Sequence, residues 1–326
     1  MIELGYTLSS EEHPAGDLVE VARLAEEAGF GFLSISDHFH PWTDAQGQSP
    51  FVWSVIGAVA NATERIRLQT GVTCPTIRIH PALVAQAAAT CAQLMPGRFA
   101  LGVGSGENLN EHVVGARWPA ADERLEMLEE AIEVIRELWA GGDTTHRGKH
   151  YTVENARVYS LPEEPPPILV AGSGPKSASL AADAGDGLVG VAPDEEFVGA
   201  YRKAGGTGPA YGQVNVCHAA SFEEGRALAR EVWPIVGIPG ELSQELPLPR
   251  HFEQAAENVT EDQIGETVAC GNDPEKHLEQ IQKFVSAGFT HVFVHQIGPG
   301  VDGQRAAIGF YRDEIMPKLD QLNQAA

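Results

Sequence analysis

The chain has 326 residues, of which 43% are hydrophobic and 21% are charged, and this ordinary globular composition excludes a disordered or fibrous protein. It carries 45 Asp and Glu against 22 Lys and Arg, so its net charge is −23. A charge this negative repels nucleic acid phosphates and anionic membranes, and we expect neither as a partner. The chain has no apolar run of 18 residues and no signal-peptide pattern, which favours a cytoplasmic protein.

Two further features of the composition bear on the cell compartment. Only six of the basic residues are lysines, so one hypothesis is a salt-rich cytoplasm, although an acidic protein of an ordinary cytoplasm fits equally well. The cysteines lack the CxxC spacing of metal and redox motifs, which predicts reduced thiols. They are Cys74, Cys91, Cys217 and Cys270.

Short apolar segments alternate with helical patterns along the whole chain, which predicts an α/β protein. The expected strands, rich in Val, Ile, Leu and Phe, are residues 2–7, 32–36, 66–70, 99–103, 168–171, 187–191, 213–217 and 290–295. Helical periodicity occupies residues 17–28, 81–94 and 123–139. Gly29, Gly185 and Gly288 each precede a strand, where a left-handed glycine would end a helix. Eight such units favour a single (β/α)8 TIM barrel over residues 1–326 rather than an open doubly wound sheet.

Two long connections interrupt this alternation and are expected to be insertion segments. Residues 146–167 are polar and proline-rich, with a hairpin expected through residues 151–159. Residues 233–268 contain two proline-rich stretches before a helical piece at residues 251–258. Connections of this length are usually lids, binding loops or ordered insertions.

In such a barrel the chemistry lies at the carboxyl ends of the strands. The second strand ends in Asp37 and His38, and an imidazole at that place can hold or release a proton near neutral pH. A buried histidine bonded to a backbone carbonyl is the structural alternative. His38 and His40 also resemble the first ligands of a metal-dependent hydrolase, but the later strand ends supply an incomplete ligand set.

The fourth and fifth strands end in glycine-rich segments. In Gly104-Ser105-Gly106 the backbone could approach a bound ring or phosphate closely, and Glu107 would then project from the barrel mouth. Alternatively, Glu107 is a carboxylate favoured in the first turn of a helix. Gly172-Ser173-Gly174 opens another helix, whose free amides form a candidate anion site.

Three motifs carry a resemblance to a known family. They are Ser-Asp-His-Phe-x-Pro-Trp at residues 36–42, Gly-Ser-Gly-Glu-x-Leu-Asn-Glu at residues 104–111, and Ala-Gly-Asp-Gly at residues 184–187. Together they closely resemble the luciferase-like flavin and deazaflavin superfamily, and within it the branch of deazaflavin-dependent dehydrogenases. The resemblance extends over nearly the whole chain.

The resemblance implies a (β/α)8 barrel, a homodimer, and coenzyme F420 bound at the barrel mouth beside a small-molecule substrate. By this resemblance His38 takes the proton of the reacting oxygen, Trp42 shapes the pocket, and Glu107 donates a proton to the ring or orients a ligand. A cis peptide bond is implied between Gly71 and Val72. The implied coenzyme contacts are Asp37, Gly71, Val72, Cys74, Ser105, Gly106, Asn110, Ser173 and Gly174.

The departures from the family pattern concern the substrate. Members that use sugar phosphates place basic side chains around the phosphate, where this chain has Asp194, Gln254 and Thr267. We therefore expect poor activity on glucose 6-phosphate and favour a secondary alcohol or an unphosphorylated sugar, whose hydroxyl group Glu11 could bind.

Several alternatives stay open at this point. Arg78 and Arg250 keep a carboxylate substrate open. An FMN-dependent monooxygenase or reductase of the same superfamily is an alternative function, and a metal-dependent barrel hydrolase is a weaker one. A coenzyme carrier without chemistry would not need His38, Trp42 and Glu107 together at the mouth.

Overall fold

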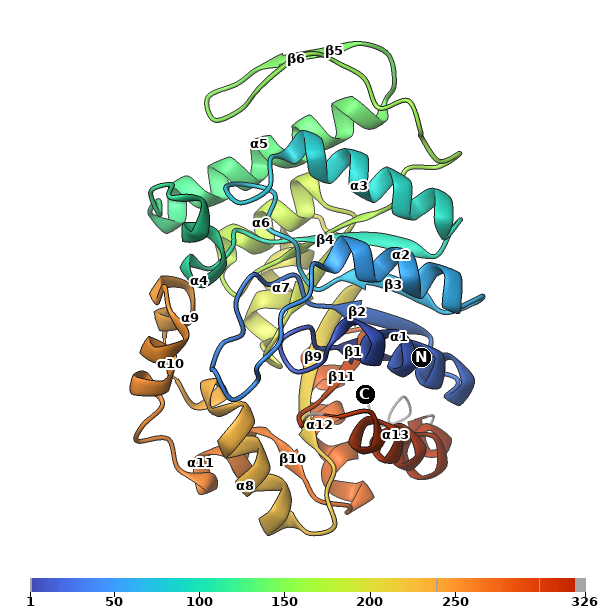
Figure 1. The fold of residues 1–326 in the computed structure, drawn as a ribbon, viewed down its shortest axis with the longest axis vertical. Coiled ribbons are helices and arrows are strands. Elements are labelled where there is room, and N and C mark those ends of the chain that lie inside the picture. The colour runs from blue at the N-terminus through green and yellow to red at the C-terminus, as the bar shows by residue number, and fades with distance from the viewer. Residues whose placement is uncertain (1, 239, 299, 320–326) are drawn as a thin grey trace.

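Eight parallel strands form a closed ring. The computed structural model describes residues 2–238, 240–298 and 300–319, and all other positions lie outside the described residues. The strands pair in the order β9-β11-β1-β2-β3-β4-β7-β8, and β8 pairs with β9 to close the ring. Their bounds are β1 Glu3–Leu8, β2 Phe32–Ile35, β3 Arg67–Thr70, β4 Phe99–Val103, β7 Ile168–Ala171, β8 Gly187–Gly190, β9 Ala210–Cys217 and β11 His291–Gln296. The (β/α)8 barrel is confirmed, and Figure 1 shows the helices around it.

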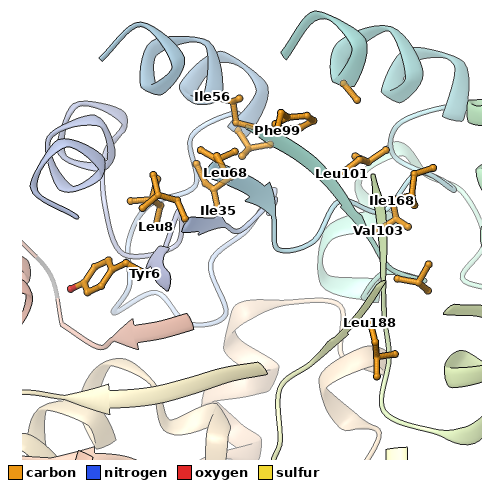
Figure 2. Packing of buried hydrophobic residues seen from close by; sticks show 14 of the residues in the cluster. Tyr6, Leu8, Ile35, Ile56, Leu68, Phe99, Leu101, Val103, Ile168 and Leu188 are labelled. Atoms are coloured by element: carbon orange, nitrogen blue, oxygen red, sulfur yellow. The ribbon is translucent and has the colours of Figure 1, made fainter. Parts of the chain in front are cut away.

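Alternate strand residues face the helices and the barrel interior. Tyr6, Leu8 and Ile35 belong to the large apolar cluster between strands and helices, part of which Figure 2 shows. A separate cluster fills the interior with Phe32, Leu169, Val189, Tyr211 and Phe293. The Phe32 ring meets the Tyr211 ring edge-on, with centroids 5.2 Å apart. The interior is therefore a packed core rather than a channel, as is usual for a ring of eight strands.

The helices follow the predicted apolar periodicity. Helix α1 buries Leu18, Val21 and Ala25 and ends at Gly29, whose φ of 93° is left-handed. Gly288 has a φ of 92°, but the same expectation for Gly185 is wrong, since its φ is −95°. Gly185 has a different reason to lack a side chain, because a Cβ there would lie 2.8 Å from the Ala181 carbonyl oxygen.

The helix bounds agree closely with the three predicted patterns. The helices around the barrel are α1 Ala15–Ala28, α2 Val52–Ala62, α3 Pro81–Leu94, α5 Ala121–Trp139, α6 Pro175–Ala184, α7 Glu195–Lys203, α8 Phe222–Val232, α12 Pro274–Ser286 and α13 Val301–Phe310. Shorter helical turns are η1 His112–Val114, η2 Pro234–Gly237, η3 Tyr311–Ile315 and η4 Met316–Lys318. Among the described residues, none of these helices is both long enough and apolar enough to cross a membrane.

The first insertion forms a hairpin, but not at the expected residues. Strands β5 Thr144–Arg147 and β6 Thr152–Ala156 pair in antiparallel fashion, so the strands begin before residue 151. Tyr151 belongs to the turn because its hydroxyl donates to the Thr76 carbonyl and its backbone N–H donates to Glu130. The hairpin is thereby tied to α5, beyond which it projects in Figure 1.

The second insertion is helical and carries its own apolar cluster. It contains α9 Leu242–Glu245, α10 Pro249–Ala255 and α11 Glu261–Thr267, and the predicted piece at residues 251–258 corresponds to α10. It is followed by a two-residue strand, β10 Ala269–Cys270, which pairs with β9 and was not predicted. Trp233, Val259 and Ile264 form part of the cluster, and Trp42 from the barrel mouth packs against it. The insertion therefore reaches the end of the barrel where the candidate site lies.

Candidate active site

Glycines allow the ends of β3 and β4 to pack closely against neighbouring parts of the barrel. A Cβ at Gly71 would lie 2.0 Å from Ser34 Oγ, and a Cβ at Gly102 would lie 1.9 Å from the Thr70 carbonyl oxygen, so no side chain fits at either position. A Cβ at Gly104 would lie 2.8 Å from a methyl group of Val72. The implied cis peptide bond between Gly71 and Val72 is confirmed. β3 and β4 are therefore closely packed at these glycines, and the contact of Gly71 and Val72 with a coenzyme stays a prediction.

His38 follows β2 and has polar groups at both ring nitrogens. Its Nε2 atom lies 3.3 Å from Glu11 Oε1. Its Nδ1 atom lies 3.1 Å from the His40 carbonyl oxygen and 3.1 Å from Asn110 Nδ2. The His38 side chain is 9% exposed. Because one donor and one acceptor flank Nδ1, both the neutral ring and the imidazolium ion find partners there.

Asn110 connects His38 to Glu107. Helix α4 spans Asn108–Glu111, and Glu107 is its N-cap residue. The Asn110 side chain lies 3.1 Å from Glu107 Oε2 through Nδ2, and its Oδ1 atom accepts backbone N–H bonds from Phe39 and His40. The strand ends of β2 and β4 are therefore joined through one buried amide.

Trp42 closes the side of His38 that faces the second insertion. The two ring centroids are 4.9 Å apart, and the Trp42 ring meets Phe252 of α10 edge-on at 5.2 Å. The backbone N–H of Trp42 donates to Gln46 Oε1 at 2.8 Å, which fixes the loop. Trp42 thus connects the insertion to His38, and its expected pocket-shaping role stays a prediction.

Glu11 is the partner of His38 rather than a group open to the mouth. Its carboxylate accepts hydrogen bonds from Ser36 Oγ at 2.5 Å and from Ser9 Oγ at 3.2 Å, and the side chain is 3% exposed. A direct contact between Glu11 and a substrate hydroxyl stays a prediction. The carboxylate stabilises a positive charge on the His38 ring.

A second Glu–His pair lies next to the first and was not predicted. Glu12 Oε2 is 2.7 Å from His295 Nε2, and His295 Nδ1 is 3.0 Å from Asn215 Oδ1, which also accepts from Gln213. Both ring nitrogens therefore face oxygens, an arrangement that suits the imidazolium ion. Burial raises the pKa of Glu12, but the hydrogen bonds from His295 and from the Gly298 backbone outweigh it, and the pKa lies below the ordinary value. The adjacent glutamates were visible in the sequence, but their partners, such as His295 at the far end of the chain, were not.

Arg78 lies between two buried carboxylates. Its guanidinium bonds Asp37 Oδ1 at 2.8 Å and lies 3.5 Å from Glu111 Oε1, and its backbone N–H donates to Glu111 Oε2 at 2.6 Å. Thr73 Oγ1 donates to the other oxygen of Asp37. The side chains of Arg78, Asp37 and Glu111 are 7%, 0% and 1% exposed. Arg78 is therefore not a free cation for a carboxylate substrate, and the coenzyme contact implied for Asp37 stays a prediction, since its carboxylate is occupied.

The environment of Glu111 makes folding stability depend on pH. Burial raises the pKa of Glu111 to about 7 from 4.5, although Arg78 acts in the opposite direction. The folded state then binds a proton that the unfolded state has lost, so this contribution is present below pH 4.5 and is lost as the pH rises through 7. The loss is of order 3 kcal/mol.

This expectation is tested by urea unfolding of the wild type and of Glu111→Gln between pH 4.5 and pH 8. The stability of the wild type should fall relative to the variant over that interval. Two curves that stay parallel would show that Glu111 does not titrate with a raised pKa.

Sequence comparison decides the family. The luciferase-like monooxygenase family matches residues 1–291. This chain belongs to that family. Among its relatives, an F420-dependent glucose-6-phosphate dehydrogenase of Beutenbergia cavernae is 36% identical over 98% of both chains. An F420-dependent hydroxymycolic acid dehydrogenase of Mycobacterium tuberculosis is also 36% identical, over 97% of this chain and 88% of the relative.

Solved structures of the luciferase-like type agree with the fold. An F420-dependent secondary alcohol dehydrogenase, in complex with an F420-acetone adduct, superimposes with a TM-score of 0.88 at 31% identity, covering 96% of this chain and 98% of the other. A coenzyme F420-dependent tetrahydromethanopterin reductase from Methanopyrus kandleri gives a TM-score of 0.79 at 20% identity, over 97% and 99% of the two chains, and supports the fold alone.

The other coenzyme contacts expected for a luciferase-like protein lie on three loops. Cys74 follows β3 and is buried, and its Sγ atom lies 3.0 Å from Thr76 Oγ1. Ser105 and Gly106 follow β4, and Gly106 has a left-handed φ of 84°. On the loop after β7, Ser173 is exposed and Gly174 is the N-cap residue of α6. The Gly174 N–H donates to Ser177 Oγ, so part of the candidate anion site is already occupied. Contacts between these residues and a coenzyme stay predictions.

The three positions expected to replace phosphate-binding cations are all exposed. Asp194 is the N-cap residue of α7 and accepts the backbone N–H of Phe197 at 3.1 Å. Gln254 lies on α10, and Thr267 ends α11, where its hydroxyl donates to the Ile264 carbonyl. Asp194 and Thr267 therefore serve their own helices, and the case against a phosphate has to be made from other residues.

No metal site accompanies His38 and His40. His40 Nδ1 lies 2.9 Å from the Leu109 carbonyl oxygen, and the His40 ring stacks on His112 with centroids 5.8 Å apart. Within the part of the chain that the structure describes, no group of three or more His, Cys, Asp or Glu side chains could hold a metal ion.

Proposed function

We propose that this chain is an F420-dependent dehydrogenase that transfers hydride between a CH–OH carbon of a small neutral substrate and the deazaflavin ring. The observation that carries this proposal is the placement of His38 between Glu11 and Asn110, just after β2, the strand that pairs with β3. It is supported by relatives more than 30% identical over almost the whole chain that are named F420-dependent dehydrogenases.

The residues present fit such a coenzyme. Gly71, Gly102 and Gly104 pack closely against neighbouring barrel atoms at the ends of β3 and β4, where the coenzyme is proposed to bind. The loop at Ser173 and Gly174 opens α6, whose N-terminus favours an anionic tail. When bound, the deazaflavin supplies a carbon that accepts or returns hydride, and the chain supplies the proton chemistry.

His38 is the group that holds the proton of the substrate hydroxyl. It accepts this proton as the C–H bond is broken and returns it in the reverse direction. Glu11 stabilises the resulting imidazolium ion across 3.3 Å. Trp42 fixes the ring plane and excludes water from one side of His38. Glu107, half-buried at the start of α4, is placed to hold or deliver a proton at the coenzyme ring.

We propose a neutral substrate, such as a secondary alcohol or an unphosphorylated sugar. The buried carboxylates of Glu11 and Glu12 lie beside His38 and His295, and the charge of Arg78 is already balanced by Asp37 and Glu111. His295 is likewise already in contact with Glu12. A phosphate would need charge-assisted donors that these residues do not offer.

A binding titration tests the cofactor. F420 and FMN are added separately to the purified protein in high KCl, and absorbance and fluorescence are followed. We expect tight binding of F420 only. Tighter binding of FMN would place the chain with the alternative FMN-dependent monooxygenases or reductases of the family, and binding of neither would contradict the proposal.

The substrate class is tested by F420 reduction. Secondary alcohols and free sugars should reduce the coenzyme faster than glucose 6-phosphate at equal concentration. Efficient turnover of glucose 6-phosphate would contradict the proposal of a neutral substrate while leaving the proposed coenzyme intact.

We further propose a cytoplasmic homodimer. Phe51 begins the α2 turn and is 58% exposed, and Leu83 in the first turn of α3 is 60% exposed. α2 and α3 pack against each other, so both apolar side chains lie on neighbouring helices. Exposed apolar groups of this size favour an interface. Light scattering distinguishes a dimer from a monomer.

A further inference from the structure

We propose that Asn110 is a positioning residue that determines which ring nitrogen of His38 carries the proton, and that it thereby couples His38 to Glu107. The chemical use of this arrangement rests on the proposed function, but the arrangement itself does not. The inference goes beyond the coenzyme contact that family resemblance implies for Asn110.

The orientation of the Asn110 amide is fixed by the backbone. Its Oδ1 atom accepts the N–H groups of Phe39 at 2.9 Å and His40 at 3.2 Å. The side-chain amide must therefore present its oxygen to the loop after β2. In the flipped orientation the NH₂ group, a donor, would face these two backbone N–H donors. Asn110 is 1% exposed, so water does not compete for these bonds. The NH₂ group points the other way.

The two hydrogens of that NH₂ group have two acceptors. Glu107 Oε2 and His38 Nδ1 each lie 3.1 Å from Asn110 Nδ2. A nitrogen that accepts a hydrogen bond carries no proton, so the neutral ring of His38 bears its proton on Nε2, which faces Glu11 Oε1.

Protonation of His38 then occurs at a defined atom, Nδ1, and the NH₂ group of Asn110 disfavours it. The second proton enters at Nδ1, where the His40 carbonyl oxygen at 3.1 Å can accept it, but the N–H of Asn110 points at the same atom. Asn110 therefore disfavours the imidazolium ion, whereas Glu11 favours it. The other titratable neighbours are Glu107, bonded to the same amide, and His40, whose Nδ1 faces the Leu109 carbonyl. Trp42, itself backed by Phe252, covers the remaining side without a charge.

The test replaces Asn110 by the isosteric aspartate. Asn110→Asp keeps an oxygen for the N–H groups of Phe39 and His40 but turns both donated hydrogens into a carboxylate oxygen beside Glu107 and His38. The pKa of His38 should rise by about one unit or more. It is measured by NMR titration of the coenzyme-free protein with ¹³C-labelled histidine, and the His38 signal is assigned with His38→Gln.

Asn108→Asp is the matched control. It adds the same charge to the same helix, but the Asn108 side chain donates to the Glu245 carbonyl and not to His38. A His38 pKa that rises equally in both variants, or in neither, would overturn the proposal. If Asn110→Asp does not fold, the ¹⁵N shifts of His38 in the wild type decide, since we expect the tautomer with the proton on Nε2, and the Nδ1–H tautomer would overturn the inference.

Activity separates this inference from the proposed function. In a working dehydrogenase, the acidic limb of the pH profile of kcat/KM should move upward in Asn110→Asp by the same amount as the His38 pKa. The His38 pKa could shift as expected while no alcohol or sugar supports F420 reduction by the wild type. That result would leave the role of Asn110 intact and contradict only the proposed function.

Discussion

His38→Asn should lower kcat/KM for coenzyme reduction by about 10²–10⁴-fold, the contribution typical of a positioned acid or base. The change is specific because the shorter amide can still offer an oxygen to Asn110 near the position of Nδ1, but an amide is not basic enough to take up a proton there. The proton of the alcohol then has no acceptor at the reacting centre. Coenzyme affinity should stay near that of the wild type, because the glycine backbone of β3 and β4 is untouched.

His40→Asn is the matched control for this prediction. His40 lies two residues further along the same loop, and its ring nitrogen faces the Leu109 carbonyl rather than Glu11. Its replacement should leave kcat/KM within a small factor of the wild type. Steady-state kinetics of both variants at several pH values provide the measurement. If His38→Asn binds the coenzyme and keeps nearly full turnover, the proton acceptor lies elsewhere.

Arg78→Met should destabilise the protein by about 3–5 kcal/mol, the usual cost of breaking a buried ion pair from one side. Methionine fills much of the space of the arginine but leaves the carboxylates of Asp37 and Glu111 buried without their cation. The effect should be largest at pH 8, where Glu111, whose pKa is about 7, is mostly charged. Urea unfolding measures it. Adding Glu111→Gln to Arg78→Met should restore part of the loss, because one of the two buried charges is removed.

Arg23 provides the comparison for Arg78. It also lies between two carboxylates, those of Glu20 and Glu27, but its side chain is 49% exposed. Arg23→Met should cost less than about 1 kcal/mol, as is usual for surface ion pairs. Equal losses for Arg23→Met and Arg78→Met would mean that burial adds nothing at Arg78. An unchanged stability with a raised KM for carboxylates would instead restore Arg78 as a substrate-binding residue.

Local pattern was sufficient for the barrel. The eight apolar segments became the eight strands of the ring because strands buried on both faces need continuous apolar runs. The predicted hairpin was misplaced because Tyr151 looked like a strand residue. In the structure this aromatic residue instead lies in the turn, where its hydroxyl contacts Thr76. β10 has two residues, too few to leave a pattern.

The site was predicted only in part, because the sequence shows which residues lie at strand ends but not which distant residues pair with them. His38, Trp42, Glu107 and Asn110 stand at strand ends, and the barrel rule brings strand ends together. The ion pairs of Arg78 with Glu111 and of Glu12 with His295 join segments 33 and 283 residues apart, as their hydrogen-bonded atoms show. Charge pattern along the chain cannot assign such partners, because each depends on the register of the closed ring.

One side of the barrel mouth is built from glycines of β3 and β4 and the other from polar side chains of β9. This difference affects which substitutions such a protein can accept. At Gly102 an added side chain would collide with the Thr70 carbonyl oxygen, and at Gly71 it would displace the Ser34 hydroxyl, so substitution on this wall is costly. Gln213 and Asn215 on β9 are joined by side-chain bonds and can be exchanged without moving the backbone of β3 and β4. The residues of β3 and β4 can therefore stay constant while those of β9 are substituted. We expect descendants of this barrel to change what they oxidise far more readily than what receives the hydride.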